Sequence, residues 1–334
     1  MIGPVQKVLI TSLGSIGRRH LTNLRALLPE ATIGALRLTA GSLPQGAAPD
    51  RSFETLADAL AFEPDAAIIA SPASEHLRLA TELVGRGVPV LVEKPFAVTG
   101  EGLGAVVALA EARSVPLRIA YNLRYHPLLR HVRQLVQAEA IGRVISVRAE
   151  VGQYLPDWRP QSRYQDGVSA NPALGGGALL ELSHELDYLY WMFGRPGRVF
   201  AAGGTLGDLN IAVEDIASLT MTYDAPERLI SVHLDFLQRA VSRTCKLIGT
   251  QGTIVADIVS GRLDLYNAAS KSWMTQHHSP LDPNQTYRDE IAAFLASLSG
   301  SQCDLPSGSE GLDVMGIIDA ARRSMSSRQL EEVR

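Results

Sequence analysis

Residues 88–96, VPVLVEKPF, constrain the fold of this chain more than any other stretch. A continuous apolar run from Val88 to Val92 is typical of a short strand covered on both faces. Pro95 has no amide hydrogen and a fixed φ, so strand pairing should stop there. Because the carboxyl ends of parallel strands open into the ligand crevice, we expect Lys94 at the edge of such a crevice. The alternative is a solvated lysine at a strand end.

Length and charge exclude several classes of protein. The chain has 334 residues, enough for two domains, and a net charge of −4 without a basic cluster for nucleic acid. No apolar stretch approaches the roughly 20 residues of a membrane span. Cys245 and Cys303 are far apart, so we expect neither disulfides nor a metal site, and a reducing cytoplasm. The N-terminal residues are predicted to form the first strand, not a secretion signal.

The first strand is predicted over Val8 to Thr11, followed by the turn SLGSIG and a helix to about Leu28. Strand, glycine turn and helix are the context of a dinucleotide fingerprint, in which the helix N-terminus attracts a pyrophosphate. Ser12 replaces the first glycine of that fingerprint, and a serine is small enough to fit against the cofactor. The alternative is a plain strand-to-helix turn.

The next strand, Ile33 to Thr39, favours NADP over NAD. An NAD site commonly has an acidic residue near this strand end to bind the ribose 2′-hydroxyl, and here there is none. Arg37, Thr39 and Ser42 could accept a 2′-phosphate instead. A polar turn without a cofactor role is the alternative.

The first 121 residues alternate strands and helices, which indicates a doubly wound parallel sheet of the Rossmann type. After the second strand, the predicted elements are a helix at 53–62, a strand at 66–70, helices at 75–86 and 101–113 and a strand at 117–120, besides the strand that ends at Lys94. We predict a dinucleotide-binding domain over residues 1–121.

Residues 122–334 are predicted to form an α+β domain for substrate binding and oligomerisation. The predicted strands lie at 143–151, 198–204, 214–223, 228–237, 243–249, 253–258 and 262–266, and tight turns between several of them indicate a mostly antiparallel sheet. Helices are expected at 286–298 and 308–326, the last available to pack back on the first domain. The long irregular stretch 152–171 is expected to bind substrate through Tyr154, Trp158, Arg159 and Arg163.

Residues 174–193 are predicted to form one helix with an apolar and a polar face. Leucines follow one stripe at a spacing of three to four residues, and the opposite stripe has Glu181, His184, Asp187 and Tyr188. Histidine suits proton transfer near neutral pH, so His184, helped by Lys94, could take the proton of an alcohol whose hydride passes to a nicotinamide. Asp187 could orient His184 or hold a substrate hydroxyl. An ordinary solvated helix face is the alternative.

Together these motifs resemble the Gfo/Idh/MocA oxidoreductases, which include glucose–fructose oxidoreductase and inositol dehydrogenase. The resemblance spans nearly the whole chain and rests on TSLGSIGRRH, IIASPASEH, the EKP triplet, YNLRYHP and GGG followed by His184-x-x-Asp187. It implies a Rossmann domain, a second domain with a large open-faced sheet, and hydride transfer at a sugar or cyclitol carbon.

The resemblance also implies roles for individual residues. Lys94 would contact the reacting hydroxyl and the nicotinamide, His184 would be the general acid and base, and Asp187 would bind or orient the substrate. Residues expected to line the cofactor are Gly14, Ser15, Ile16, Ser71, Glu93, Lys94, Asn122 and Arg124. Glu181 and Tyr188 are predicted substrate contacts, although family members often have an acid four residues before the histidine and Glu181 lies three before it. The segment YLPDWRP with ELSHELDY resembles a branch seen with surface-polysaccharide or nonulosonic-acid synthesis.

The sequence thus predicts an NAD(P)-dependent oxidoreductase acting on CH–OH groups of a sugar, sugar derivative or cyclitol. A non-catalytic NAD(P)-binding sensor on the same fold is the alternative, and a scaffold protein is a third hypothesis. A broad uncovered sheet face tends to pair with its symmetry mate, so we expect a homodimer or homotetramer. Substrate, reaction direction and oligomer size do not follow from the sequence.

Overall fold

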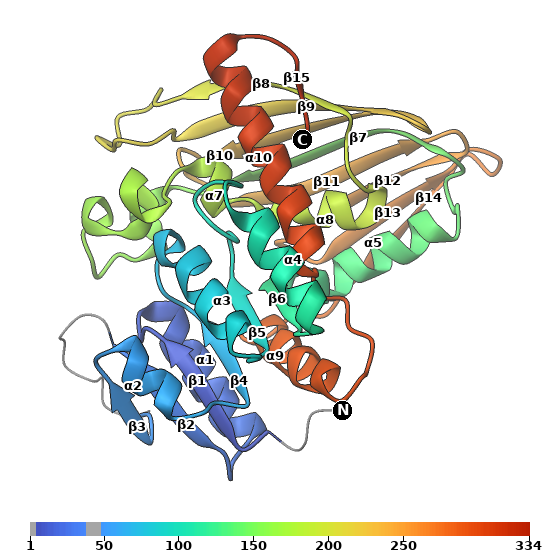
Figure 1. Ribbon diagram of the computed structural model, residues 1–334. Coiled ribbons are helices and arrows are strands. Elements are labelled where there is room, and N and C mark those ends of the chain that lie inside the picture. The colour runs from blue at the N-terminus through green and yellow to red at the C-terminus, as the bar shows by residue number, and fades with distance from the viewer. Residues whose placement is uncertain (1–4, 38–47) are drawn as a thin grey trace. The chain divides into compact units, whose positions relative to one another are not determined.

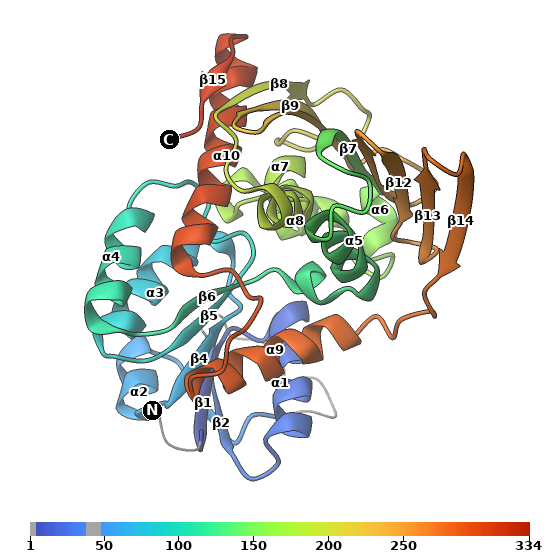
Figure 2. The same cartoon turned by 90° about the vertical axis from the view of Figure 1, so that its right-hand side faces the viewer.

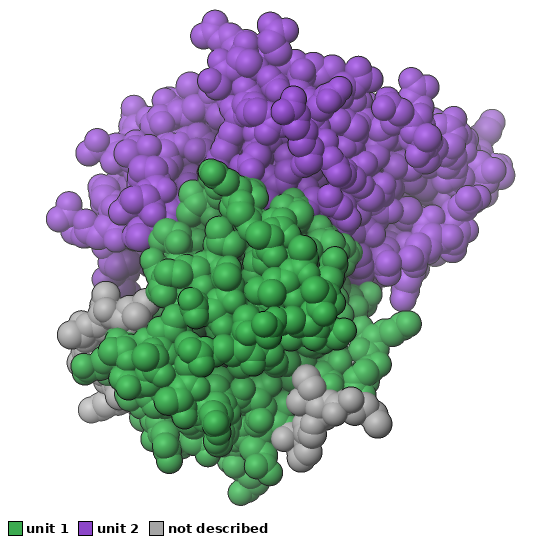
Figure 3. Space-filling view, in the orientation of Figure 1, with its two compact units in different colours: residues 1–122, 283–312 green, residues 123–282, 313–334 purple. Residues whose placement is uncertain are grey.

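The computed structural model describes residues 5–37 and 48–334 (Figure 1). Its chain divides into two compact units (Figure 3). Unit 1 comprises Met1–Asn122 and Pro283–Leu312, and unit 2 comprises Leu123–Asp282 and Asp313–Arg334. The segment 283–312 therefore belongs with the first unit, whereas the sequence had assigned it to the second domain.

Unit 1 contains a six-stranded sheet in the order β3-β2-β1-β4-β5-β6, in which each neighbouring pair is parallel. The strand order reverses at β1, as in a doubly wound dinucleotide-binding sheet. The central strands are buried along their whole length, which explains their continuous apolar runs. Their bounds are β1 Lys7–Thr11, β2 Thr32–Leu36, β3 Arg51–Phe53, β4 Ala66–Ile69, β5 Val90–Glu93 and β6 Leu117–Ala120. The Rossmann prediction is confirmed.

The helices of unit 1 include one from the far end of the chain. Helix α9 packs beside α1, as Figure 2 shows. The predicted helix over 53–62 is wrong at its start, because Phe53 ends a strand and the helix begins after Thr55, whose side chain caps it. The helices are α1 Ser15–Leu27, α2 Leu56–Ala61, α3 His76–Gly85, α4 Leu103–Arg113 and α9 Gln285–Leu298, with a 3₁₀ turn at Ala73–Glu75. A further 3₁₀ turn, Asn122–Tyr125, starts at the last residue of the segment Met1–Asn122 and continues in unit 2.

Unit 2 contains a nine-stranded sheet in the order β14-β13-β12-β11-β7-β10-β9-β8-β15. Its described pairs are antiparallel except for β7 with β10, so the predicted mostly antiparallel sheet is confirmed. The strands are β7 Val144–Gly152, β8 Arg198–Gly204, β9 Ile216–Asp224, β10 Glu227–Asp235, β11 Ser242–Gly249, β12 Gly252–Asp257, β13 Arg262–Asn267, β14 Ser272–His277 and β15 Glu331–Glu332. Strand β14 and the short β15 were not predicted.

Alternation along the strands gives this sheet one buried face. One register row, Val199–Met221–Ile230–Val147–Leu247–Ile254, is buried across six strands. The adjacent row places Phe200, Thr220, Ser231, Arg148 and Lys246 on the opposite face, where Phe200 is 43% exposed. Helices α7 and α8 contact strands of the sheet, as does α5.

The helices of unit 2 correct one prediction. The stretch 174–193 is not one helix, because α7 Ala178–Glu181 ends before α8 His184–Phe193 begins. The remaining helices are α5 Pro127–Gln137, α6 Leu155–Trp158 and α10 Gly308–Ser327, whose first turn lies in unit 1; 3₁₀ turns occur at Tyr164–Asp166, Val168–Ala170 and Pro172–Leu174. Among the described residues, none of the helices is both long and apolar enough to cross a membrane.

Candidate active site

The turn after β1 has the backbone of a dinucleotide fingerprint despite its serine. Ser12 has a φ of +76°, the left-handed region that glycine enters without steric cost. Its amide donates a hydrogen bond of 2.8 Å to the carbonyl of Leu36 at the end of β2. The chain therefore turns at the carboxyl ends of two neighbouring parallel strands, where a first glycine would be expected.

Gly14 and Gly17, the two glycines of this turn, differ in what surrounds them. A Cβ at Gly17 would lie 2.1 Å from the carbonyl oxygen of Ser12, so only glycine lets α1 approach the turn. A Cβ at Gly14 would meet nothing closer than 3.9 Å, so the space above Gly14 is open. Helix α1 begins there without a side-chain cap and without an acidic residue in its first turn. An uncapped helix start beside open space fits the pyrophosphate of a dinucleotide, with Ser15 and Ile16 in that first turn.

The ends of β4 and β5 are joined by a buried histidine that the sequence analysis did not single out. His76 is 1% exposed, and its ring nitrogens contact the carbonyl oxygens of Ser71 at 2.8 Å and Pro95 at 2.9 Å. Burial lowers the pKa of His76, although both carbonyls oppose that shift. The hydroxyl of Ser71 is itself buried without a hydrogen-bond partner in the described part of the chain. An unpaired hydroxyl at the carboxyl edge of the sheet fits the predicted cofactor contact.

Lys94 directly follows β5 and is half-buried. The Lys94–Pro95 peptide is cis, and the Lys94 amide donates to the Glu93 carboxylate at 3.1 Å. Glu93 is only 6% exposed and also contacts His20 of α1. Lys94 therefore lies at the strand end where the sequence placed it.

The other predicted cofactor residues of unit 1 are placed in part. Arg37 follows β2 and its amide donates to the carbonyl of Phe53. Ser42 and Thr39 lie outside the described residues. Asn122 is buried and its side-chain amide donates to the hydroxyl of Thr286 at 2.7 Å.

In unit 2, Asp187 is held by Arg124. Both side chains are 1% exposed, and Nε and Nη2 of Arg124 reach the carboxylate oxygens at 2.8–3.1 Å. The guanidinium also lies 5.7 Å from the ring centre of Trp191. Asp187 is therefore not part of an open polar face, and the predicted four-residue face is wrong.

The break between α7 and α8 separates the predicted face. His184 is the first residue of α8 and is half-buried, whereas Glu181 ends α7 and accepts a hydrogen bond of 2.7 Å from Ser169. Ser169 belongs to the irregular stretch 152–171, so this bond joins that stretch to α7. The glycines before α7 serve packing: a Cβ at Gly177 would lie 2.4 Å from the carboxylate of Glu214. Glu214 in turn accepts from the Leu179 amide at 3.1 Å and satisfies the start of α7.

Tyr188 is completely buried and does not face solvent as predicted. Burial first, and then the neighbouring Cys245 and Glu185, raise the pKa of its phenol well above the usual value. Glu185, which the sequence analysis missed, is also completely buried and pairs with Arg243 at 2.8 Å. Its only local signal was an acid beside the predicted catalytic histidine.

The stretch 152–171 presents a mixture of packed aromatic rings and exposed arginines. The ring of Trp158 packs edge-on against Phe236 with centroids 5.2 Å apart, and Arg239 lies 3.7 Å from the ring centre of Tyr154. Arg159 and Arg163 are exposed. The aromatic residues are therefore anchored, whereas the two arginines remain available to a ligand.

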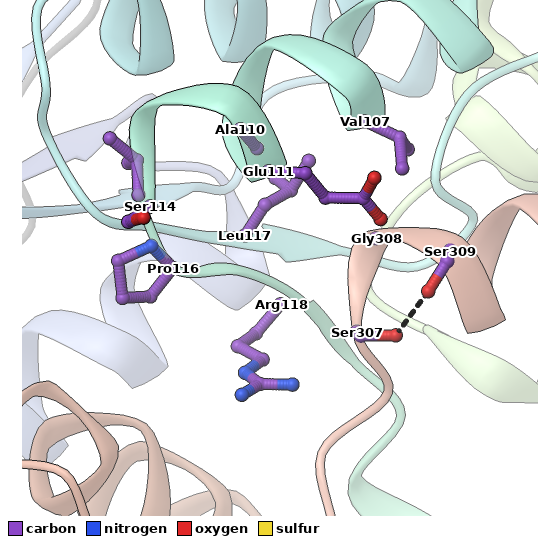
Figure 4. A pocket seen from close by; sticks show the side chains of 11 residues that line it. Val107, Ala110, Glu111, Ser114, Pro116, Leu117, Arg118, Ser307, Gly308 and Ser309 are labelled. Atoms are coloured by element: carbon purple, nitrogen blue, oxygen red, sulfur yellow. Dashed lines mark hydrogen bonds between the residues drawn. The ribbon is translucent and has the colours of Figure 1, made fainter.

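A pocket of about 260 Å³ lies elsewhere in unit 1 (Figure 4). None of the predicted site residues lines it. The hydroxyl groups of Ser307 and Ser309 form a hydrogen bond of 2.8 Å with each other. The lining residues are Val107, Ala110, Glu111, Ser114, Val115, Pro116, Leu117, Arg118, Ser307, Gly308 and Ser309. This set contains no histidine, lysine or cysteine, so we do not assign it to the chemistry.

Comparisons with known proteins agree with the two-part fold. Residues 7–121 match a family model described as "Oxidoreductase family, NAD-binding Rossmann fold", and residues 129–255 match the GFO/IDH/MocA C-terminal domain. A D-xylose 1-dehydrogenase (NADP(+)) of Haloferax volcanii is 26% identical over 78% of each chain. A 1,5-anhydro-D-fructose reductase of Ensifer adhaerens is 25% identical over 95% of this chain and 99% of the relative.

Solved structures with low sequence identity share the fold. A levoglucosan dehydrogenase in complex with NADH matches with a TM-score of 0.85 and 20% identity, covering 98% of this chain and 99% of the other. The WlbA dehydrogenase from Bordetella pertussis in complex with NADH and UDP-GlcNAcA matches with a TM-score of 0.79 and 20% identity, covering 98% of both chains.

Proposed function

Because this chain belongs to the GFO/IDH/MocA oxidoreductase family, we propose that it transfers a hydride between NAD(P) and a carbinol or ketone carbon of a sugar, sugar derivative or cyclitol. The observation that supports cofactor binding most is the turn after β1. There Ser12 adopts the left-handed backbone of a glycine, and the uncapped α1 starts beside the open space at Gly14.

In this proposal the chain supplies proton handling and the cofactor supplies redox chemistry. Bound nicotinamide accepts or donates the hydride. Lys94 donates a hydrogen bond to the reacting oxygen, and His184 takes the hydroxyl proton during oxidation and returns it during reduction. Asp187, on the same helix as His184, orients that histidine or the substrate, and Arg124 balances its negative charge.

Two substitutions test these roles. We expect Lys94→Met to abolish turnover while NAD(P)H affinity stays largely intact, and His184→Ala to reduce kcat by roughly 10²–10⁴-fold. Turnover is followed by nicotinamide absorbance and affinity by nicotinamide fluorescence. Near-normal turnover of Lys94→Met would contradict its role, and cofactor binding without turnover of any sugar tested would favour the non-catalytic sensor.

Cofactor binding itself is tested at Gly14. Gly14→Ala adds a methyl group to open space, so we expect an unchanged Tm and NAD(P)H affinity weakened about tenfold or more. Gly85→Ala is the matched control, because a Cβ there also meets nothing but lies at the end of α3, away from the turn. Unchanged affinity in Gly14→Ala would argue against the pyrophosphate at this turn.

For the cofactor we favour NADP. Arg37 follows β2 where an NAD site commonly has a carboxylate, and the Haloferax relative is named for NADP. We expect Arg37→Glu to weaken NADPH binding much more than NADH binding. Equal effects on both cofactors would remove the basis for this preference.

For the substrate we propose a sugar or cyclitol, with an anionic sugar derivative as the form to test first. Arg159 and Arg163 are exposed on the stretch 152–171, and guanidinium groups recognise phosphate and carboxylate. A screen of xylose, inositol, uronic acids and UDP-linked sugars, with Arg159→Gln beside the wild type, identifies the class. A neutral sugar turned over equally by both proteins would exclude the anionic form.

We also propose a homodimer or homotetramer formed through the exposed face of the nine-stranded sheet, in the reducing cytoplasm. Phe200 and Leu229 are 43% and 47% exposed on this face, and the two cysteines are free. Light scattering after size exclusion would measure the mass, and Phe200→Lys should reduce it to that of one chain.

A further inference from the structure

Unit 1 contains a fully enclosed cluster of three ionisable groups that the proposed chemistry does not use directly. His20 lies on α1, Glu93 ends β5, and Glu290 lies on α9, near the other end of the chain. Their exposures are 0%, 6% and 0%, and their polar atoms lie within 4.8 Å of one another. The cluster therefore joins three elements at Glu93, the residue that directly precedes Lys94 and Pro95.

Glu93 is the centre of this cluster and uses both of its oxygens. Oε1 lies 2.6 Å from Nε2 of His20, and Oε2 accepts the backbone N–H of Lys94 at 3.1 Å. When Glu93 accepts hydrogen bonds at both oxygens, as a carboxylate does, Nε2 of His20 is the donor. The bond from α1 thus fixes the carboxylate that holds the Lys94 amide.

The other side of the same turn is fixed by His76. Its Nδ1 lies 2.9 Å from the Pro95 carbonyl, while Nε2 contacts the carbonyl of Ser71. Two buried imidazoles therefore brace the turn, one through the amide of Lys94 and one through the carbonyl of Pro95.

Glu290 brings a second carboxyl group to the cluster. Neither of its oxygens has a hydrogen-bond partner among the described residues, although the side chain is completely buried. Burial, followed by the charge of Glu93, raises its pKa well above the usual value, and Arg19 acts in the opposite direction. The groups that face Glu290 are Glu93, His20, Arg19 and Tyr287, and burial raises the pKa of Tyr287 to about 12.

Two ionised carboxylates sealed together would each lose their hydration and would repel one another. A proton on Glu290 removes one of these charges and leaves Glu93 as the single anion. Glu93 can then hold both His20 and the Lys94 amide without repulsion from its neighbour.

We propose that His20 and Glu290 are positioning residues for Lys94, acting through Glu93. This inference rests on the proposed function only where it concerns turnover. The geometric part, that the cluster holds the Lys94 amide, stands independently of any substrate.

The role of His20 is tested with two substitutions of similar size. Gln retains an N–H near the position of Nε2, whereas Met fills the space without a donor. We expect His20→Met to lower kcat by about 10–100-fold, with little change in NAD(P)H affinity. This is the effect of losing a hydrogen bond that orients a ligand residue at a metal site. His20→Gln should recover most of that loss.

Hydrogen exchange of the Lys94 amide, measured by NMR, gives a readout that needs no substrate. Exchange should be faster in His20→Met than in the wild type and should return toward the wild-type rate in His20→Gln. Equal exchange in all three proteins would overturn the proposal. If exchange changes as expected but the wild type turns over no sugar, the role of the cluster in holding the Lys94 amide is supported and only the proposed function is contradicted.

The proton on Glu290 is tested by infrared spectroscopy at pH 8, where exposed carboxyl groups are ionised. We expect the carbonyl band of a protonated carboxylic acid in the wild type and its loss in Glu290→Gln. Elemental analysis of the same purified samples measures their content of divalent metal, which tests the opposing explanation. A stoichiometric divalent metal that disappears in Glu290→Gln would show that a cation, rather than a proton, neutralises the cluster, and would overturn this mechanism.

Discussion

Units 1 and 2 balance their buried charges in different ways. In unit 2, Arg124 pairs with Asp187 and Arg243 pairs with Glu185, so each of these buried carboxylates has its own guanidinium. In unit 1, the imidazole of His20 contacts Glu93, whereas neither oxygen of Glu290 has a hydrogen-bond partner among the described residues. An arginine remains charged at any ordinary pH, whereas burial without a hydrogen-bond partner favours the protonated, neutral form of Glu290. The comparison predicts pH-independent buried pairs in unit 2 and a pH-dependent cluster in unit 1.

The largest expected effect is the loss of one partner from the Arg124–Asp187 pair. Either Arg124→Met or Asp187→Leu removes one charge of this buried pair, so we expect the free energy of unfolding to fall by about 3–5 kcal/mol. The double variant should recover most of this loss. Urea denaturation followed by tryptophan fluorescence is suitable, because Trp191 lies beside Arg124.

An exposed pair provides the control for this prediction. Arg163 and Asp166 lie 3.7 Å apart with side chains 78% and 70% exposed, so Asp166→Ala should change stability little. Similar small effects at Asp187 would show that burial does not distinguish the two pairs.

The next effect concerns the dependence of stability on pH in unit 1. Because the pKa of Glu290 is raised on folding, the native state holds a proton that the unfolded state releases above about pH 4.5. The stabilisation from this proton is complete below that pH and is lost as pH rises toward the raised pKa. The slope is at most about 1.4 kcal/mol per pH unit.

Glu290→Gln should remove that slope, so the variant should gain stability relative to wild type between pH 5 and pH 8. Denaturation curves at intervals across this range would measure the difference. The exposed Glu111→Gln serves as a control in the same unit and should follow the wild type. Parallel curves for Glu290→Gln and wild type would mean that Glu290 does not carry the extra proton.

The smallest effect is expected at Ser12. A left-handed φ of +76° costs a serine about 1 kcal/mol relative to glycine, so Ser12→Gly should raise the free energy of unfolding by about that amount. Calorimetry would detect the rise in Tm. Ser114→Gly is the matched control, since Ser114 has a φ of +53° at the end of α4, outside the cofactor turn.

Both serine variants should be stabilised, but only Ser12→Gly can also affect NAD(P)H affinity. A destabilised Ser12→Gly protein would show that the serine side chain, whose hydroxyl lies 3.4 Å from the Gly14 amide, supports the turn more than its backbone strains it.

The stretch 174–193 shows why the predicted site was only partly correct. Its leucine spacing fits a continuous helix, but two hydrogen bonds accompany the interruption. The Leu179 amide at the start of α7 donates to Glu214, and the Ser183 hydroxyl after α7 donates to the Leu180 carbonyl. The interruption puts His184 at a helix start and lets Asp187 and Tyr188 turn inward. Periodicity describes which residues are apolar, and it does not reveal a partner 35 residues away that caps a shorter helix.

The sequence by itself determined the elements whose signals are local. Continuous apolar runs, glycine turns and proline stops defined the parallel sheet, the turn at Ser12 and the position of Lys94 after β5, because burial on both faces of a strand restricts each residue in turn. Only the tertiary structure decided which charged groups meet. Arg124 and Asp187 are 63 residues apart, and Glu290 reaches Glu93 from a helix that returns to the first unit. Such partners are chosen by long-range packing and by the need to neutralise buried charge, for which no local pattern exists.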